Sequence, residues 1–423
     1  MNASRRDFLK GGAALAAWGL TGCATRSRRS GLAKVVVVGA GYGGATAARY
    51  LRLLDANIHV TLIDAAEPYL SCPGSNDVIA GLQPLAALQC NHSGLSRNWD
   101  VQRVRATVKA IDPDRRQVRL HNDAVLAYDR LILSPGIDFR WDAIAGYDEA
   151  ASQTVPHAWK AGPQTELLYR QLQAMPANGT LIICAPPNPY RCPPGPYERA
   201  SLIAHYLQQR KPRAKLLILD GKSQFSKQAL FQEAWRRYYP GLLEWLPYTR
   251  TGRLERVDAQ SLTVHTEFEL FKADVLNVIP PQQAGALARQ AGLADAAGWC
   301  PVHPGSFAST LAPDIHVIGD ACNAGPMPKS AFAAGSQAKA CALAVAASLQ
   351  DRPIPAPALI NTCYSFVTPQ AAISVAGVYK IERGQLSNVA GGETPLTGDW
   401  QEEARYAQNW RRAVRSDAFA ENS

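Results

Sequence analysis

The stretch KVVVVGAGYGGA at residues 34–45 decides the fold of this chain. Its four consecutive valines predict a buried strand, and the residues that follow continue as a helix to Leu54. The glycines between them, Gly39, Gly41 and Gly44, have the spacing Gly-x-Gly-x-x-Gly. This pattern allows a tight turn, a close approach of the backbone to a pyrophosphate, and close packing of helix on strand. The helix N-terminus adds free N–H groups for the phosphates.

A second apolar run, residues 58–63, ends on Asp64, which stands 20 residues after Gly44. An acidic residue at the end of the second strand of such a unit accepts a hydrogen bond from a ribose hydroxyl. Strand, glycine loop, helix, strand and acid occur here in the required order. The sequence therefore predicts a Rossmann-like unit that binds a dinucleotide.

The composition is that of a globular protein, and 423 residues can bury two or three domain cores. The formal net charge of +9 is concentrated at the N-terminus, where residues 1–31 carry six basic side chains and one acid. Without that +5 the remainder has a charge of +4, and no basic stripe is interleaved with aromatic residues. We therefore expect no nucleic acid partner.

The first 24 residues have the features of a targeting segment. The sequence SRRDFLK at 4–10 resembles a twin-arginine export signal, and the apolar stretch at 11–22 is too short to span a bilayer comfortably. LTGC at 20–23 also resembles a lipoprotein cleavage box with Cys23 as the lipidated residue; ordinary cleavage after Ala24 is the alternative. Both interpretations predict the bacterial periplasm, with membrane contact only if Cys23 is lipidated. Residues 25–33 then form a linker.

The chain has nine cysteines, which in an exported protein are candidates for disulfides or reactive sites. Cys72 follows Asp64 by eight residues, in the segment YLSCP. There is no Cys-x-x-Cys-His sequence and no cysteine or histidine cluster with zinc spacing, so no metal site is predicted. Cys90, in a polar stretch, is a candidate free thiol. Buried, inert thiols are predicted at Cys184, Cys300, Cys322 and Cys341.

The chain after Cys72 is polar and is predicted to be loop to about Asn98. Alternating residues at 104–111 and 117–120, and a further strand at 125–133, predict a β-meander. This meander would close the first part of the dinucleotide-binding domain, residues 34–149.

A second βαβ unit is predicted within residues 150–273. A strand at 180–184, a helix at 197–209 and a strand at 215–220 follow in order. The loop after the first of these strands reads APPNPYRCPPGP in place of a glycine fingerprint. Prolines lack the N–H groups that a pyrophosphate needs. We therefore predict a Rossmann-like domain that does not bind a nicotinamide nucleotide.

Residues 274–352 are predicted to return to the first domain. A buried strand at 314–318 leads into Gly319 and Asp320, and an alanine-rich helix follows from about 330 to 349. In FAD enzymes the acid at this turn meets the ribityl and phosphate region. The N-terminus of this helix, near Lys329, is predicted to direct positive charge at the flavin, and Lys329 is a candidate cofactor-binding residue. Residues 353–423 form a separate C-terminal part that begins with a proline-rich linker.

Together these features resemble one family, the flavoprotein subunit of flavocytochrome c sulfide dehydrogenase. The resemblance covers nearly the whole chain, and its most specific stretch is RCPPGPYERAS at 191–201. The other matching stretches are the twin-arginine leader, residues 35–48, Cys72 with Ser75 and Asn76, PHAWKAG at 156–162, GWCPV at 298–302, MPKS at 327–330 and NTCYS at 361–365.

The resemblance implies an α/β fold with two Rossmann-like, glutathione-reductase-type nucleotide-binding domains and a small C-terminal interface domain. It implies FAD, held covalently through a thioether from Cys72. It also implies a redox-active disulfide between Cys192 and Cys363. The implied partner is a separately encoded c-type cytochrome subunit in a heterodimer.

The implied reaction is the oxidation of sulfide. Hydrosulfide is a nucleophile, and a disulfide is an electrophile for it. Attack would leave a persulfide on one cysteine and a thiolate on the other, from which two electrons reach the flavin and then, singly, a haem iron.

Three alternatives stay open at this point: a sulfide:quinone reductase, oxidation of another small sulfur compound, and a non-enzymatic FAD-binding electron-transfer protein. Quinone reduction would need an apolar or amphipathic C-terminal membrane surface. Residues 400–423 are instead charged, although Trp400, Trp410 and a lipidated Cys23 would leave room for membrane contact. The two predicted redox cysteines argue against a protein without enzymatic activity.

Overall fold

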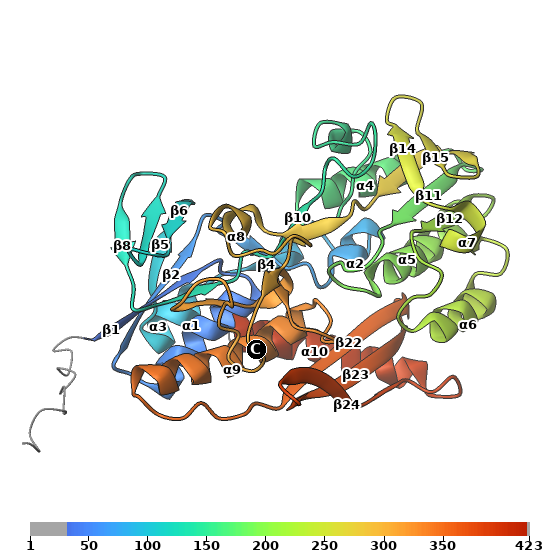
Figure 1. The fold of residues 1–423 in the computed structure, drawn as a ribbon. Coiled ribbons are helices and arrows are strands. Elements are labelled where there is room, and N and C mark those ends of the chain that lie inside the picture. The colour runs from blue at the N-terminus through green and yellow to red at the C-terminus, as the bar shows by residue number, and fades with distance from the viewer. Residues whose placement is uncertain (1–31, 421–423) are drawn as a thin grey trace, which may run out of the picture. The chain divides into compact units, whose positions relative to one another are not determined.

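The computed structural model describes residues 32–420. The targeting segment predicted at 1–24 and most of the linker at 25–33 lie outside the described residues. Within them, two domains contain parallel sheets and a C-terminal part contains an antiparallel sheet (Figure 1). The predicted α/β class with two Rossmann-like domains is therefore confirmed.

The first domain is centred on a five-stranded sheet with the order β20-β9-β1-β2-β5. β9 pairs in parallel with both β1 and β20, and β2 pairs in parallel with β5. Helix α1 (Tyr42–Leu54) packs on β2 and on the alanine-rich helix α9 (Ala331–Leu349). The strands are β1 (Ala33–Val38), β2 (Ile58–Asp64), β5 (Gln102–Arg105), β9 (Arg130–Leu133) and β20 (Ile315–Val317).

Two predictions for the first domain are corrected. The expected strand at 125–133 is divided, because Val125–Ala127 (β8) pairs with the meander whereas β9 enters the parallel sheet. The expected loop before residue 98 contains two short helices, α2 (Ser75–Ile79) and α3 (Ser93–Trp99). They form because Ile79 and Leu95 are completely buried, which the polar local composition does not reveal. The rest of the meander is β6 (Val108–Asp112) and β7 (Gln117–Leu120).

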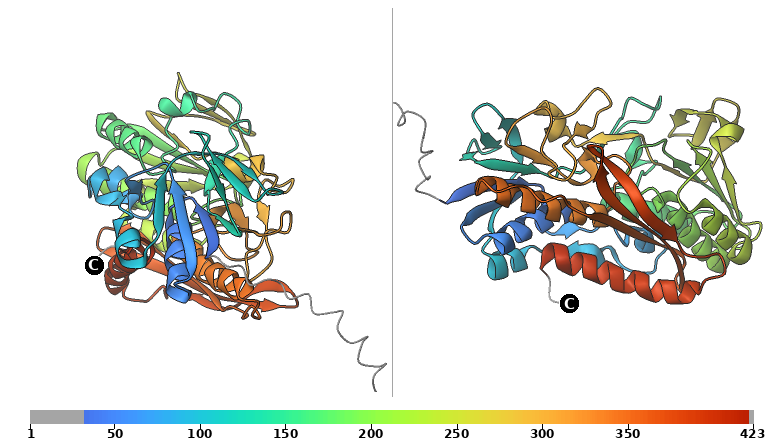
Figure 2. Two further views of the ribbon diagram at one scale, coloured as in Figure 1. Left: turned by 90° about the vertical axis from the view of Figure 1, so that its left-hand side faces the viewer. Right: turned by 60° about the horizontal axis from the view of Figure 1, so that its bottom comes forward.

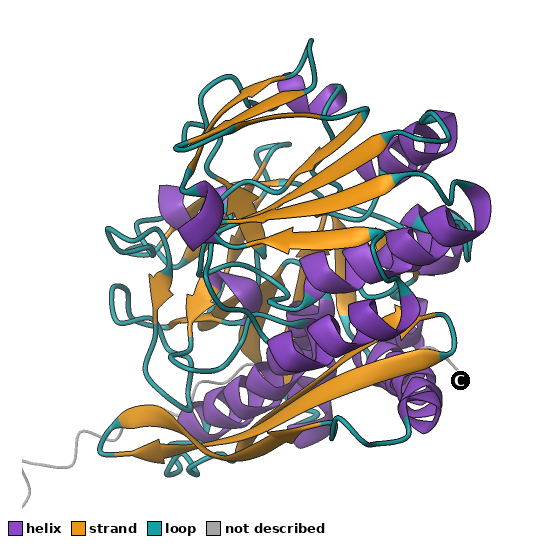
Figure 3. Ribbon diagram, turned by 90° about the vertical axis from the view of Figure 1, so that its right-hand side faces the viewer, coloured by secondary structure: helices purple, strands orange, loops and turns teal. Residues whose placement is uncertain are grey.

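The second domain contains a parallel four-stranded sheet in the order β13-β12-β11-β17. Its central strand is buried on both sides, so that Leu181, Ile182 and Ile183 are all inaccessible, as expected for a sheet covered on two faces. Figure 3 shows helices beside these strands. The elements are β11 (Thr180–Ala185), β12 (Lys215–Asp220), β13 (Leu243–Leu246), β17 (Val275–Val278), α4 (Pro163–Ala174), α5 (Gly195–Arg210), α6 (Gln228–Tyr238) and α7 (Tyr248–Thr251).

The C-terminal part is a three-stranded antiparallel sheet followed by one long helix. β22 (Leu359–Thr368), β23 (Ala371–Glu382) and β24 (Gln385–Glu393) pair in sequence order. Helix α10 (Trp400–Phe419) packs on β23 and on α1, and Figure 2 shows it beside the sheet. β22 also packs against α5 of the second domain and α9 of the first. The C-terminal part therefore touches both nucleotide-binding-type domains.

Short strand pairs complete the fold. The pair β10–β18 is antiparallel, and the pair β19–β21 places Cys300 opposite Cys322. Cys90, predicted as a candidate free thiol in a loop, is buried in β4. The remaining elements are β3 (Tyr69–Leu70), β4 (Gln89–Cys90), β10 (Ile137–Phe139), β14 (Leu254–Asp258), β15 (Thr263–Thr266), β16 (Leu270–Lys272), β18 (Gln282–Ala284), β19 (Cys300–Pro301), β21 (Cys322–Asn323) and α8 (Ala286–Gln290).

Of the helices that the structure describes, α9 alone is long and apolar enough in composition to cross a membrane. It is a core helix, since Ala338, Cys341 and Val345 are completely buried within the protein. Cys184, Cys300 and Cys322 are likewise buried, as predicted.

Candidate active site

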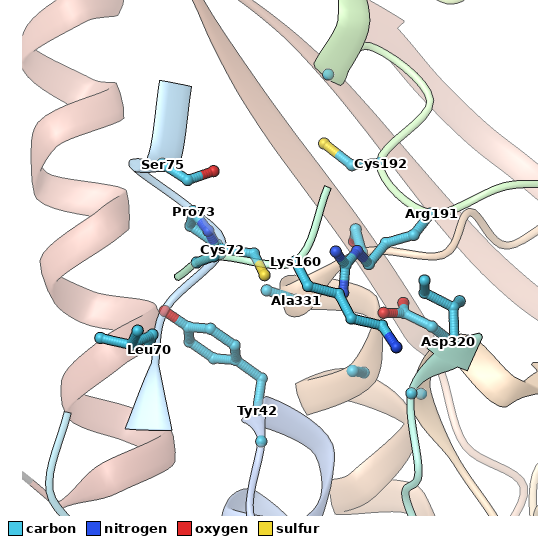
Figure 4. A pocket seen from close by; sticks show the side chains of 18 of the residues that line it. Tyr42, Leu70, Cys72, Pro73, Ser75, Lys160, Arg191, Cys192, Asp320 and Ala331 are labelled. Atoms are coloured by element: carbon cyan, nitrogen blue, oxygen red, sulfur yellow. The ribbon is translucent and has the colours of Figure 1, made fainter. Parts of the chain in front are cut away.

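One cavity of about 520 Å³ joins the glycine loop of the first domain to cysteines from the second domain and the C-terminal sheet. In Figure 4 the side chains of Cys72, Arg191 and Asp320 lie around the same space. Gly44 and Lys329 lie outside its wall. The predicted site residues that line it are Gly39, Gly41, Asp64, Cys72, Cys192, Gly319, Asp320 and Cys363.

The glycine loop is shaped as the fingerprint predicts. Gly39 has a φ of +91°, and a Cβ there would lie 2.3 Å from the carbonyl oxygen of Ser134. A Cβ on Gly44 would lie 1.8 Å from the carbonyl oxygen of Gly39, so Gly44 permits helix α1 to approach the strand without lining the cavity. Gly41 precedes the first turn of α1 and no side chain caps it. The first N–H groups of this helix are therefore available to an anion at the cavity.

Asp64 stands at the end of β2, beside this loop. Its Oδ2 accepts from the N–H of Ala40 at 2.5 Å, and its Oδ1 accepts from the N–H of Ala66 at 2.7 Å. These bonds fix the carboxylate at the cavity wall, and each oxygen retains a lone pair for a ribose hydroxyl.

Asp320 has an unsatisfied oxygen. Its Oδ1 is buried and has no hydrogen-bond partner. Burial raises the pKa of Asp320, and the positive charges of Arg191 and Lys329 act in the opposite direction. A buried polar atom without a hydrogen-bond partner costs folding free energy. We therefore expect a hydrogen-bond donor in the cavity to pair with Asp320 Oδ1. The glycine loop, Asp64 and this orphaned oxygen together fit FAD, whose hydroxyl groups can supply such donors.

Cys72 is half-buried in the cavity wall, in the turn between β3 and α2. The N–H of Ser75 donates to its carbonyl at 3.0 Å, and Gly74 has a φ of +93°. The neighbouring Ser71 hydroxyl lies 2.8 Å from the Tyr42 hydroxyl. Pro73 and Gly74 therefore form a defined turn that directs the thiol into the cavity (Figure 4).

Cys192 and Cys363 are distant in sequence and close in space. Cys192 lies in the loop before α5, with a φ of +56°, and Cys363 lies on β22. Burial raises the pKa of the Cys192 thiol, with the adjacent Cys363 as the next largest cause. Both cysteines are free thiols in this structure, so the expected disulfide is not formed here. The fold has brought the two cysteines that such a bond would join to the wall of one cavity.

The loop that carries Cys192 is anchored to the first domain. The N–H of Cys192 donates to the carbonyl of Lys329 at 2.7 Å, and the N–H of Gly195 donates to the carbonyl of Cys192 at 2.8 Å. A Cβ on Gly195 would lie 3.0 Å from Cys192 Sγ. The proline-rich loop thus presents a cysteine where the first domain presents phosphate-binding glycines.

Lys329, a candidate cofactor-binding residue, is not among the residues that line the cavity. Its ammonium donates to the carbonyls of Asp320 at 2.9 Å and Cys322 at 2.7 Å, and lies 3.8 Å from the centre of the Trp299 ring. These contacts hold the side chain of Lys329 against the turn that carries Asp320, inside the protein. The basic residues that line the cavity are Lys160, Arg191, Arg199 and Arg411.

Arg191 and Glu198, on either side of Cys192 in the most specific stretch, were not predicted as site residues. Burial alone would lower the pKa of Arg191. The neighbouring Cys72 and Asp320 have the larger combined effect and raise the pKa of Arg191. Burial also raises the pKa of Glu198, although the charge of Arg411 opposes that shift. Both side chains line the cavity. Their position in the same distinctive stretch as Cys192, residues 191–201, was the one available signal.

The second domain differs from a nucleotide site at its strand end. Asp220, at the end of β12, is 1% exposed. Its Oδ2 accepts from Tyr197 at 2.5 Å and Trp245 at 2.9 Å, and its Oδ1 accepts from Lys222 Nζ at 2.6 Å. The acid that would bind a ribose is enclosed by side chains of the domain itself.

Comparisons with known proteins place these features in a class. The pyridine nucleotide-disulphide oxidoreductase family matches residues 33–161. The solved structure of sulfide:quinone oxidoreductase from Aquifex aeolicus has the same fold, with a TM-score of 0.73, 16% identity, and coverage of 92% of this chain and 93% of that one. The chain is therefore an FAD-dependent oxidoreductase of the two-dinucleotide-binding-domain class.

The family within that class follows from three further matches. The family "Sulfide dehydrogenase [flavocytochrome c] flavoprotein chain, central" matches residues 165–280, and "Flavocytochrome c sulphide dehydrogenase, flavin-binding" matches residues 355–419. The sulfide dehydrogenase flavoprotein chain of Chlorobaculum thiosulfatiphilum is 52% identical over 48 residues, which are all of that sequence and 11% of this chain. The chain belongs to the family of the flavocytochrome c sulfide dehydrogenase flavoprotein chain.

Two other matches bear on coverage and export. A ferredoxin–NAD(+) reductase component from Paraburkholderia xenovorans is 36% identical over 124 residues, which are 29% of this chain and only 30% of that relative. A twin-arginine translocation signal sequence matches residues 2–22. The chain therefore carries a twin-arginine export signal.

Proposed function

We propose that this protein oxidises hydrosulfide at a Cys192–Cys363 disulfide and passes the electrons through FAD to a c-type cytochrome. The observation that carries the proposal is the meeting of these two cysteines in one cavity with the glycine loop of the first domain. A disulfide at this point is an electrophile beside the electron carrier, and hydrosulfide is small enough to reach it. Family membership supports the same substrate.

The chain's own residues supply the sulfur chemistry. In the oxidised pair, hydrosulfide attacks one sulfur and forms a persulfide, while the other sulfur leaves as a thiolate. We assign to Glu198 the role of holding or returning a proton, because burial raises its pKa above the ordinary value and it lines the same cavity as Cys192. Arg191 places a positive charge between Cys192 and Asp320 (Figure 4). FAD, when bound, accepts two electrons and releases them singly.

Cys72 is proposed to hold FAD through a thioether. Its thiol lines the cavity between the glycine loop and Cys192, where the reactive part of the cofactor would lie if the glycine loop binds its pyrophosphate. A covalent bond would prevent loss of the cofactor after export. The proposed location is the periplasm, where c-type cytochromes are available as one-electron acceptors.

A nicotinamide nucleotide is not the proposed acceptor. The loop after β11 is rich in proline, and Asp220 already accepts from Tyr197, Trp245 and Lys222. A ribose would have to break these buried bonds to reach the carboxylate.

A quinone is the second candidate acceptor. Trp410 of α10 lines the cavity beside Tyr364, with ring centres 5.9 Å apart, and lies parallel to Phe332 at 6.3 Å. Such an aromatic wall could bind an apolar ring. The charged surface of α10, with Glu402 and Arg412, favours a soluble partner over a membrane.

The test is anaerobic flavin reduction in the purified holoenzyme. Sulfide and NADH are added in separate cuvettes, and the flavin absorbance is followed. We expect bleaching by sulfide and none by NADH, and loss of the sulfide reaction in Cys192→Ser and Cys363→Ser. The matched control is Cys184→Ala, which removes a buried thiol of β11 outside the cavity.

The acceptor is tested in the same preparation. After reduction by sulfide, oxidised cytochrome c or a soluble quinone is added in stoichiometric amount. Reoxidation by the cytochrome is expected, and faster reoxidation by the quinone would favour the second candidate. Bleaching by NADH alone would contradict the proposal.

A further inference from the structure

Lys227 is a buried lysine, 1% exposed, behind one of the two cavity cysteines. It precedes α6 of the second domain, and its ammonium reaches the C-terminal sheet. Nζ donates to Ser365 Oγ at 2.8 Å and to the carbonyls of Cys363 and Ile373, each at 3.3 Å. The positive charge of Lys227, a residue of the second domain, is therefore held beside strand β22 at Cys363.

The hydrogen bonds of this ammonium, within the part of the chain that the structure describes, go only to uncharged oxygens. Burial lowers the pKa of Lys227 to about 8, and the shift is opposed most strongly by Cys363, then by Glu198, Cys192 and Glu393. A buried ammonium without a carboxylate in contact is costly to a fold. A preorganised charge of this kind is useful where negative charge develops during a reaction.

The surroundings of the two sulfurs differ. Asn361 Nδ2 donates to Cys363 Sγ at 3.5 Å, and Ser330 Oγ fixes Asn361 by donating to its Oδ1 at 2.7 Å. The negative charge of Glu198 opposes a negative charge on Cys192, whereas Arg191 and, more weakly, Lys227 favour one. The other charged or titratable groups around the pair are Arg199, Tyr190, Tyr379 of β23 and Glu393 of β24.

We propose that Lys227 is a positioning residue that holds the Cys363 sulfur as the leaving thiolate when the Cys192–Cys363 disulfide is opened. The proposal rests on the sulfide oxidation proposed above. Hydrosulfide attacks Cys192 Sγ, the bond between the two cysteine sulfurs breaks, and its electron pair goes to Cys363 Sγ. Cys192 becomes the persulfide, –S–SH. The substrate sulfur is oxidised and the disulfide is reduced in this one exchange, so no further reactant enters.

Three variants separate charge from structure. Lys227→Met removes the charge, and Lys227→Arg keeps it. The matched control is Lys211→Met, which removes a buried ammonium that also donates to backbone carbonyls, those of Gln173 and Met175, outside the cavity. A stabilising role without effect on the cysteines would make Lys227→Met and Lys211→Met alike.

The first readout is the reactivity of the Cys363 thiol. The holoenzyme is reduced with dithiothreitol and freed of it, and alkylation of Cys363 by iodoacetamide is followed against pH by peptide mass spectrometry. In Lys227→Met we expect a roughly tenfold slower reaction at pH 7, because the thiolate is the reactive form. Lys227→Arg and Lys211→Met should follow the wild type. Equal curves for Lys227→Met and the wild type would overturn the proposal. If Lys227→Met does not fold with flavin, Lys227→Gln takes its place.

The second readout is the location of the persulfide. The oxidised wild-type holoenzyme receives one equivalent of sulfide without air and is then alkylated and digested. A persulfide on Cys192 is expected, and a persulfide on Cys363 would overturn the direction of attack. A wild-type disulfide that does not react with sulfide would instead contradict the proposed function, whereas the alkylation curves test Lys227 in either case.

Discussion

The side-chain amide of Asn76 donates to Glu198 Oε2 at 2.9 Å, so the segment after Cys72 is fastened to the helix that follows Cys192. The other carboxyl oxygen of Glu198 accepts from the N–H of Phe366, on the strand that carries Cys363, at 3.0 Å. One buried carboxyl therefore connects the three segments that bring cysteines to the cavity.

The substitution Glu198→Gln tests whether this carboxyl carries a proton. We expect sulfide-dependent flavin reduction to slow by roughly 10²-fold, because an amide keeps the shape but cannot exchange the proton. The measurement is anaerobic stopped-flow absorbance at several sulfide concentrations. Glu166→Gln, on the exposed side of α4, is the control and should leave the rate unchanged. A rate within twofold of wild type in Glu198→Gln would assign this side chain to structure only.

The substitution Cys72→Ser tests covalent attachment. Because the glycine loop and Asp64 remain, we expect the variant to bind FAD but to release it on acid precipitation, whereas wild-type flavin stays with the protein. Flavin fluorescence in the supernatant and in a denaturing gel measures the two fractions. Cys192→Ser should retain its flavin as the wild type does. Release of all flavin from the wild type would show that the thioether is absent.

The substitution Arg199→Lys tests the interior of the second domain. Arg199 is 1% exposed and donates to Asn76, His157, Ala158 and Asn277. A lysine cannot satisfy these four acceptors, so we expect the free energy of unfolding to fall by about 2–3 kcal/mol. Urea unfolding measures the change, and the exposed Arg210→Lys on the same helix should stay within about 0.5 kcal/mol. Equal stability of the two variants would contradict the assigned hydrogen bonds.

Lys227 should also give the protein a pH-dependent stability. Burial lowers the pKa of Lys227 in the native state to about 8, below the ordinary lysine value of 10.5, so between these values the unfolded state binds more protons. Stability must then rise with pH across this window, and the gain is lost as pH falls through 8. Relative to Lys227→Met, we expect the wild type to gain about 3 kcal/mol from pH 8 to 10.5, measured by urea unfolding. A constant difference between the two proteins would mean that the ammonium does not titrate there.

Elements with strong local signals were predicted well from the sequence. The second-domain strand at 215–220 has the predicted bounds, because its continuous apolar run is interpretable without its neighbours. The glycine loop was predicted for the same reason, since the spacing of its glycines is a local pattern and Gly44 is required by contact with Gly39, five residues earlier. The helices α2 and α3 were missed, because their stability comes from burial against distant segments and their own composition is polar.

The sequence by itself determined the α/β class, the dinucleotide loop and the family, because these depend on local spacing and residue type. The tertiary structure alone decided that Lys329 donates to the carbonyls of Asp320 and Cys322, and that Lys227, from another domain, donates to the carbonyl of Cys363. It also decided that Glu198 joins three segments. Such relationships depend on how the domains pack. The charge of a side chain acts through space, so the local sequence does not show which distant residue it affects.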